Sequence, residues 1–156
     1  MDDIIIEQTY PYPIEHVWEA LTDPKALADW LMPGDFAAVV GHRFQFRTKP
    51  RPEFDGVVHC EVLEVEKPRR LSYSWKTGDM HKPTIVTFIL TLTPDGGTRL
   101  RLEHKGFEGD NGLRMHPLLK QGWKKKLDTF LPAVIDCFTE KGYVRKASLK
   151  PDESCS

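Results

Sequence analysis

Several features that mark specialised classes of protein are absent from this sequence or scarce in it. It has three cysteines, Cys60, Cys137 and Cys155, and no two of them lie close together in the chain. Their odd number and wide spacing argue against a disulfide framework and against a zinc site. No apolar run approaches the roughly 20 residues that a membrane-spanning helix needs. We therefore expect no membrane partner.

An excess of charge of one sign is also lacking. The 156 residues include 22 basic and 23 acidic side chains, which gives a formal net charge of −1. Nucleic-acid binders usually carry a strong basic excess, so no nucleic-acid partner is expected. Asp2 and Asp3 stand where a secretory signal would carry positive charge, and the expected location is cytoplasmic.

Motifs of common catalytic machinery are missing as well. There is no Gly-x-Ser-x-Gly elbow and no Gly-rich phosphate loop followed by Lys-Ser/Thr, and Ser72 and Ser74 are expected to face solvent. The six histidines never pair at metal-ligand spacing. Glu61 and Glu64 are expected to be solvated strand residues. The sequence thus predicts no catalytic residue, no metal and no cofactor.

The chain does contain a clear succession of hydrophobic periods. A first strand precedes two short helices that are limited by prolines, and period-two alternation then continues to about residue 105. One face of each later strand is apolar and the other polar, which is typical of an antiparallel sheet with one wet face. The expected strands are Ile4–Tyr10, His42–Thr48, Gly56–Glu66, Arg69–Lys76, Thr84–Leu92 and Thr98–Lys105.

A long helix is expected to follow, over residues 112–141. Its apolar stripe has spacings of three and four residues, and Pro132 within it should kink the axis. Gly142 is a plausible cap. We predict one α+β domain over residues 1–142, in which a curved antiparallel sheet of six or seven strands packs on this helix, and a polar tail over 143–156. The stripe consists of Leu119, Trp123, Leu127, Phe130, Val134 and Phe138.

Several stretches resemble the START-like (SRPBCC) superfamily. Val17–Pro24, with Leu27 and Trp30 behind it, resembles the helix pair of that superfamily. Other stretches are similar to the branch related to the activator of a heat-shock chaperone ATPase, and the match continues in order up to Lys141. The stretches similar to that branch are Glu61–Leu71, Tyr73–Trp75, His104–Phe107, Gly122–Trp123 and Leu127–Asp128.

The resemblance implies the helix-grip fold of START-like and Bet v 1-like proteins, with a cavity between sheet and helix. Superfamily members bind lipids, hormones, flavonoids or polyketides, some are cyclases or hydrolases, and the eukaryotic namesake stimulates a chaperone. Three functions follow as hypotheses. The first is binding of a small, largely apolar molecule by a monomer or homodimer. The others are interaction with a chaperone and a cyclase or hydrolase reaction in which His104 transfers protons.

A ligand pocket is expected beside the bend at Pro132, because a bent helix leaves a space between itself and the sheet. His104 should be its main polar group, although a buried histidine satisfied by its neighbours is the competing interpretation. A filled core at this place would favour the surface-interaction hypothesis. The side taken by His59 is open, and the loops 49–55 and 106–112 could gate the cavity. The predicted pocket residues are Trp30, Phe44, Phe46, Trp75, Phe88, Leu102, His104, Trp123, Leu127 and Phe130.

Overall fold

The computed structural model describes residues 3–52, 54–78, 82–139 and 142–143. Elements and bounds agree with the sequence pattern to within one residue for every expected strand. In chain order the elements are β1 (Ile4–Tyr10), α1 (Ile14–Thr22), α2 (Pro24–Trp30), β2 (Arg43–Arg47), β3 (Val57–Glu66), β4 (Arg70–Trp75), β5 (Thr84–Leu92), β6 (Thr98–Lys105), α3 (Gly109–Lys125), the π-helical turn η1 (Lys126–Phe130), α4 (Leu131–Ile135), β7 (Phe138–Thr139) and β8 (Gly142–Tyr143).

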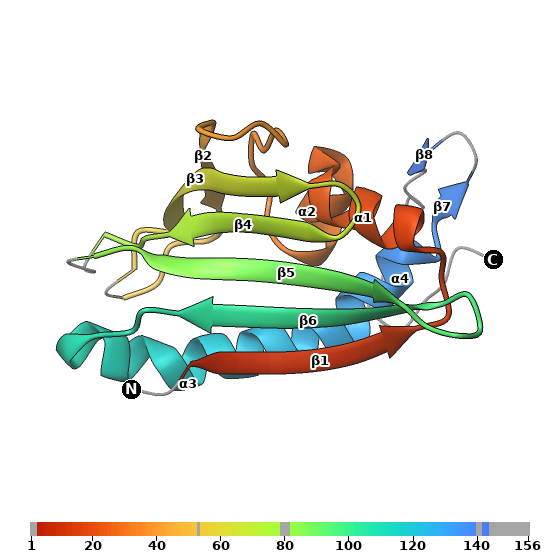
Figure 1. Cartoon of the computed structure of the whole chain (residues 1–156). Helices are drawn as coiled ribbons and strands as arrows, with labels where there is room; N and C mark the ends of the chain where they lie inside the picture. The colour runs from red at the N-terminus through yellow and green to blue at the C-terminus, as the bar shows by residue number, and fades with distance from the viewer. Residues whose placement is uncertain (1–2, 53, 79–81, 140–141, 144–156) are drawn as a thin grey trace.

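The main sheet has six strands in the order β1-β6-β5-β4-β3-β2, and all its pairs are antiparallel. This confirms the predicted α+β class and sheet. The first strand of the main sheet, β1, pairs with its last strand, β6, and Ile4 lies opposite His104. In Figure 1 the four helices lie behind the sheet, so that one face is covered and the other is turned to the viewer. The alternation of buried and exposed residues along β5 and β6 fits this arrangement.

Buried apolar residues of the sheet, of α1 and α2, and of the last helix form one core. Val17, Trp18 and Leu21 of α1 are buried at helical spacing, as predicted. Trp30 of α2 is 1% exposed, and its indole Nε1 donates a hydrogen bond to the Ala20 carbonyl at 2.7 Å. The helix pair is therefore tied together within the core.

The long helix differs from the prediction at both ends. It begins at Gly109, and its last segment ends at Ile135 instead of residue 141. Phe138 lies in β7 and Gly142 in β8, so Gly142 does not cap the helix. The division of the chain at residue 142 remains a prediction, since β8 crosses it and most of 143–156 lies outside the described residues.

The expected kink at Pro132 takes the form of the π-helical turn directly before it. The Leu131 N–H donates to the Lys126 carbonyl, five residues back, which leaves the Leu127 carbonyl without its usual donor. Pro132 has no N–H to offer. The buried Tyr10 hydroxyl donates to this carbonyl instead, at 2.7 Å. A side chain of β1 thereby satisfies the irregular turn.

The extra residue in the π-helical turn shifts the apolar stripe. Trp123, Leu127, Leu131 and Val134 are buried, whereas Phe130 is only half-buried. The ring of Phe130 lies 5.7 Å from Lys125 Nζ. Leu131 therefore occupies the core position that the sequence analysis predicted for Phe130.

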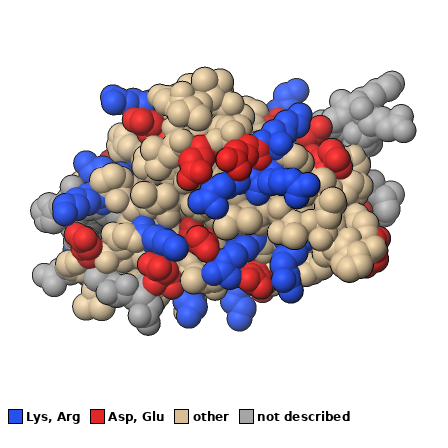
Figure 2. All heavy atoms as spheres, viewed as in Figure 1, with Lys and Arg blue, Asp and Glu red and all other residues tan. Residues whose placement is uncertain are grey.

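The outer face of the sheet carries charges of both signs, interspersed over the surface seen in Figure 2. Arg43 pairs with Glu61 at 3.1 Å and Arg70 with Glu64 at 3.0 Å, so both glutamates are surface residues as expected. The prediction for Ser72 is wrong. Ser72 is 1% exposed and its Oγ lies 3.2 Å from Thr87 Oγ1, because the two side chains face each other on inner strands.

The cysteines differ from one another in state. Cys60 is a free, buried thiol. Cys137 is disulfide-bonded, although the number and spacing of the cysteines argued against a disulfide framework. Cys155 lies outside the described residues. No helix in the described part of the chain is both long enough and apolar enough to cross a membrane.

Candidate ligand-binding site

Aromatic rings fill the place where the sequence predicts an enclosed pocket. The ring centroids of Trp75 and Trp123 are 5.4 Å apart, those of Trp75 and His104 5.7 Å, and those of His104 and Trp123 6.2 Å. Phe88 packs edge-on against Trp123 at 5.9 Å. The prediction of an enclosed pocket around His104 is therefore wrong, and the competing interpretation of a filled core holds here.

His104 is fully buried, and both nitrogens of its ring have partners. Trp123 Nε1 donates to His104 Nδ1 at 3.0 Å, so Nδ1 is an acceptor. His104 Nε2 then carries the proton and donates to Thr84 Oγ1 at 2.6 Å, and Thr84 donates to the Trp75 carbonyl at 3.0 Å. This chain of hydrogen bonds, which we call the His104 chain, connects α3 to β6, β5 and β4.

The neutral state of His104 follows from its surroundings. Burial, with a smaller effect from His116, lowers the pKa of His104 to about 3. A cationic ring would have a proton on Nδ1, where the Trp123 N–H already points. His104 is thus a neutral structural residue at ordinary pH, and neither of its nitrogens is available to a ligand.

An open cavity lies next to this filled centre, between α3, the β2–β3 loop and the end of α2. Its volume is about 630 Å³. Trp75 and Trp123 form its inner wall and are the two predicted pocket residues that line it. The lining consists of Leu31, Met32, Thr48, Arg51, Pro52, Phe54, Val58, Trp75, Thr77, Arg114, Met115, Leu118, Leu119, Gln121, Gly122, Trp123, Lys125 and Lys126.

The other eight predicted pocket residues lie elsewhere. Phe130 is half-buried beside Lys125, and the remaining seven are core residues, of which Phe44 also borders a second hollow. The predicted role of Trp75 and Trp123 in ligand contact stays a prediction. The buried seven are Trp30, Phe44, Phe46, Phe88, Leu102, His104 and Leu127.

Sequence reasoning missed the cavity because it followed the stripe towards Pro132 instead of away from it. Met115, Leu119 and Trp123 recur every four residues, so the signal for a lining face on α3 was present. Arg51 and Phe54 come from the β2–β3 loop, as expected of a loop at the mouth. The segment 106–112 is different, because α3 already begins at Gly109. Whether either segment gates the cavity stays a prediction.

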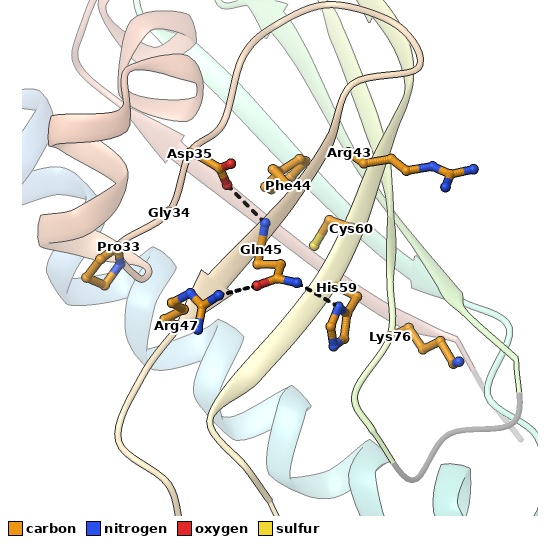
Figure 3. A pocket seen from close by; sticks show the side chains of 10 residues that line it. All are labelled: Pro33, Gly34, Asp35, Arg43, Phe44, Gln45, Arg47, His59, Cys60 and Lys76. Carbon is orange, nitrogen blue, oxygen red and sulfur yellow. Dashed lines mark hydrogen bonds between the residues drawn. The ribbon is translucent and has the colours of Figure 1, made fainter.

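The second hollow, of about 810 Å³, lies over β2 and β3 (Figure 3). Its polar side chains bind one another. Gln45 Oε1 accepts from Arg47 at 2.5 Å, its Nε2 lies 3.2 Å from His59 Nδ1, and its backbone N–H donates to Asp35 at 3.1 Å. His59 is exposed and belongs to this outer side. Because these groups are already paired, the apolar cavity beside α3 is the better candidate site.

Among the residues that the structure describes, no three His, Cys, Asp or Glu side chains come together as a metal site would require. About half of the residues that line the cavity beside α3 are apolar, and its charged lining residues are basic. Such a chamber suits retention of an organic molecule.

Comparison with known proteins gives both a family and several related folds. The family model for "Activator of Hsp90 ATPase homolog 1-like protein" matches residues 11–135. Protein MLL2253 from Mesorhizobium loti is 36% identical, with a TM-score of 0.75 and coverage of 84% of this chain and 94% of its own. No curated protein sequence gives a significant match.

Two further structures share the fold at lower identity. DynU16, a protein of the dynemicin biosynthetic locus, is 24% identical with a TM-score of 0.71; the match covers 92% of this chain but only 50% of DynU16. The Aha1 dimer from Colwellia psychrerythraea is 21% identical with a TM-score of 0.66, and the match covers 81% of this chain and 91% of that one. At these identities the likeness shows the fold alone.

Proposed function

We propose that this chain, which belongs to the Activator of Hsp90 ATPase homolog 1-like family, binds a small, largely apolar molecule in the cavity beside α3. The observation that carries the proposal is the cavity itself. Its volume of about 630 Å³ lies within the range of roughly 300–1,000 Å³ typical of small-molecule sites. Half of its lining is apolar, with Trp75 and Trp123 at the inner wall.

The fold supports this proposal in a general way. The cavity here lies between the sheet and the long helix, which is where the resemblance to START-like proteins implies a ligand.

The enzyme hypothesis receives less support from the side chains. A proton-transfer role for His104 needs a ring nitrogen that can reach the substrate. Both nitrogens of His104 are used in the His104 chain, and the residue does not line the cavity. Binding without catalysis is therefore the better account of the site.

Interaction with a chaperone remains the rival from a different class, and the filled core around His104 counts in its favour. A protein-binding surface would be expected to show a patch of one charge or a contiguous apolar patch. The face in Figure 2 carries mixed charges, and several of them are paired with each other. This surface gives the rival no specific support.

Gly122 offers a direct test, because it lines the cavity from α3. A Cβ placed on Gly122 would meet only Lys126 Nζ, at 3.8 Å, so larger side chains can enter the cavity without a backbone clash. We expect Nile red, a neutral apolar dye, to bind the parent and to bind progressively more weakly from Gly122→Ala to Gly122→Leu to Gly122→Trp. Removal of a helical glycine should leave stability unchanged or raise it by up to about 1 kcal/mol.

Lys124→Leu is the matched control, because Lys124 is exposed on the same helix outside the lining. It should bind the dye as the parent does. Equal affinity in the parent and Gly122→Trp, both with intact melting curves, would place binding elsewhere. Native mass spectrometry of the parent and Gly122→Trp would show in parallel whether a co-purified small molecule disappears with the cavity.

A further inference from the structure

Every charged side chain in the described lining of the cavity beside α3 is basic. Arg51 comes from the β2–β3 loop, Arg114 and Lys125 from α3, and Lys126 from the start of η1. No described lining residue is Asp or Glu. The chain as a whole has a net charge of −1, so this concentration of one sign is a local property of the cavity.

Three of these basic residues lack a counter-ion within the described part of the chain. None of the ion pairs found there includes Arg51, Lys125 or Lys126. Lys126 is half-buried, and burial together with the charges of Lys125 and Arg51 lowers its pKa. Like charges therefore approach one another across the two walls of the cavity, and a bound anion would relieve their repulsion.

The inner wall offers a further donor. Trp75 is 3% exposed, and its buried indole Nε1 has no hydrogen-bond partner among the described residues. An indole N–H can only donate, and a buried donor without an acceptor destabilises the fold. Oxygen atoms of a ligand would satisfy it. The basic residues would be stabilised by an anion, and the Trp75 N–H by a hydrogen-bond acceptor. An anionic group with oxygen atoms can provide both.

We propose that the occupant of this cavity is an amphipathic molecule with an apolar body and one anionic group. The body packs on Met115, Leu119 and Trp123, and the anionic group lies between Arg51 and Lys126. This inference rests on the proposed function, because it specifies the ligand class of the same cavity. It goes beyond that function in predicting discrimination between molecules of equal apolar size by their charge.

Three probes with the same alkyl chain test the inference: decanoate, decanol and decylamine, each used to displace Nile red from the parent protein. We expect decanoate to bind at least about tenfold more tightly than decanol, since one charge-assisted hydrogen bond is worth about that factor or more in affinity. Decylamine should bind more weakly than decanol. The advantage of decanoate should shrink as salt is added, whereas decanol binding should not weaken.

Two variants on opposite walls assign the effect. Lys126→Met keeps the length and the apolar stem of the side chain, and Arg51→Gln removes the charge of the other wall. Each should reduce the decanoate advantage several-fold and leave decanol affinity near that of the parent. Lys124→Met is the control, because it removes an exposed charge of the same helix that does not line the cavity. Melting curves report whether each variant is folded.

The outcomes separate the two proposals. Equal affinity for decanoate and decanol in the parent would overturn the anionic ligand class and leave the apolar cavity function standing. A decanoate advantage that survives in both Lys126→Met and Arg51→Gln would also overturn it, because the selectivity would then arise elsewhere. If neither Nile red nor any alkyl probe binds the parent, the proposed function fails and this inference fails with it.

Discussion

Trp123 connects packing to polarity at the centre of the molecule. Its ring contacts the rings of Trp30, Trp75 and Phe88, and its Nε1 begins the His104 chain. The same residue also forms part of the cavity wall. A change at Trp123 therefore affects stability through two separable effects, lost apolar contact and a lost hydrogen bond.

Two substitutions at Trp123 should separate those effects. Trp123→Ala removes a 98% buried ring and should lower the free energy of unfolding by about 3–5 kcal/mol. Trp123→Phe keeps most of the contact but leaves the Nδ1 lone pair of His104 buried without a donor, at a cost of about 1–3 kcal/mol. Urea unfolding measures both. A Trp123→Ala protein as stable as the parent would contradict the placement of this side chain.

His104 gives a prediction about pH. Its pKa is about 3 in the folded protein against 6.5 for an unperturbed histidine, so the unfolded chain takes up the proton first as the pH falls. Its stabilising effect is therefore complete above the unfolded pKa and is lost progressively as the pH falls from there towards 3. The loss is about 1.4 kcal/mol per pH unit within that window.

The pH effect can be measured against His104→Gln, which does not titrate. Between pH 7 and pH 5 the free energy of unfolding should fall by about 2 kcal/mol more in the parent than in this variant. The comparison cancels the carboxyl groups that titrate in both proteins. Parallel pH profiles of the two proteins would show that His104 is not held in its neutral form.

At the level of elements, the π-helical turn explains where the last helix places its residues. Pro132 removes one N–H, and the turn before it leaves the Leu127 carbonyl unpaired within the helix. Tyr10 supplies the missing donor, and Gln8 of the same strand hydrogen-bonds to Asp128. Strand β1 is thus the element that holds the irregular turn in place.

Tyr10→Phe tests this relation between β1 and η1. The substitution removes one hydroxyl from a buried position and leaves the Leu127 carbonyl without a partner, so we expect a loss of about 1–3 kcal/mol in the free energy of unfolding. Tyr12→Phe is a suitable control, because the Tyr12 hydroxyl is part-buried and lies 3.4 Å from Asp136, a weak contact. Equal effects of the two substitutions would argue against a special role for Tyr10.

The elements were largely predictable from the sequence because the alternation of apolar and polar residues is regular from β1 to β6. The end of the last helix was not. A proline shows that one backbone hydrogen bond of the helix is lost. The sequence does not reveal whether the helix bends at that point or forms a π-helical turn. Phe130 and Leu131 are adjacent in the sequence and both are apolar. Periodicity therefore could not show that Leu131, and not Phe130, is the buried one.

At the scale of the whole molecule, the sequence predicted a chamber between sheet and helix but placed it at the wrong end of the helix. The inward parity of Trp75, His104 and Trp123 was correctly identified. The alternation pattern shows which face of the sheet or helix a side chain lies on. It does not show whether rings that face each other are in contact. Here they touch, and the open space lies on the side of Met115 and Leu119, between α3 and the β2–β3 loop.

Hydrogen exchange over the whole chain would locate the ligand independently of any substitution at the site. The β2–β3 loop contains two useful amides, since Arg51 N–H donates to the Phe54 carbonyl at 2.8 Å and Phe54 N–H to the Arg51 carbonyl at 2.9 Å. Both residues line the cavity, and loop hydrogen bonds of this kind open more readily than those of a central strand.

Saturation with decanoate should therefore slow exchange at Arg51 and Phe54 several-fold and leave β5 and β6 nearly unchanged. Gly122→Trp, whose side chain occupies the cavity, should abolish the response to decanoate. Slower exchange over β2 and β3 at Gln45 and His59, with none in the loop, would instead assign binding to the hollow of Figure 3.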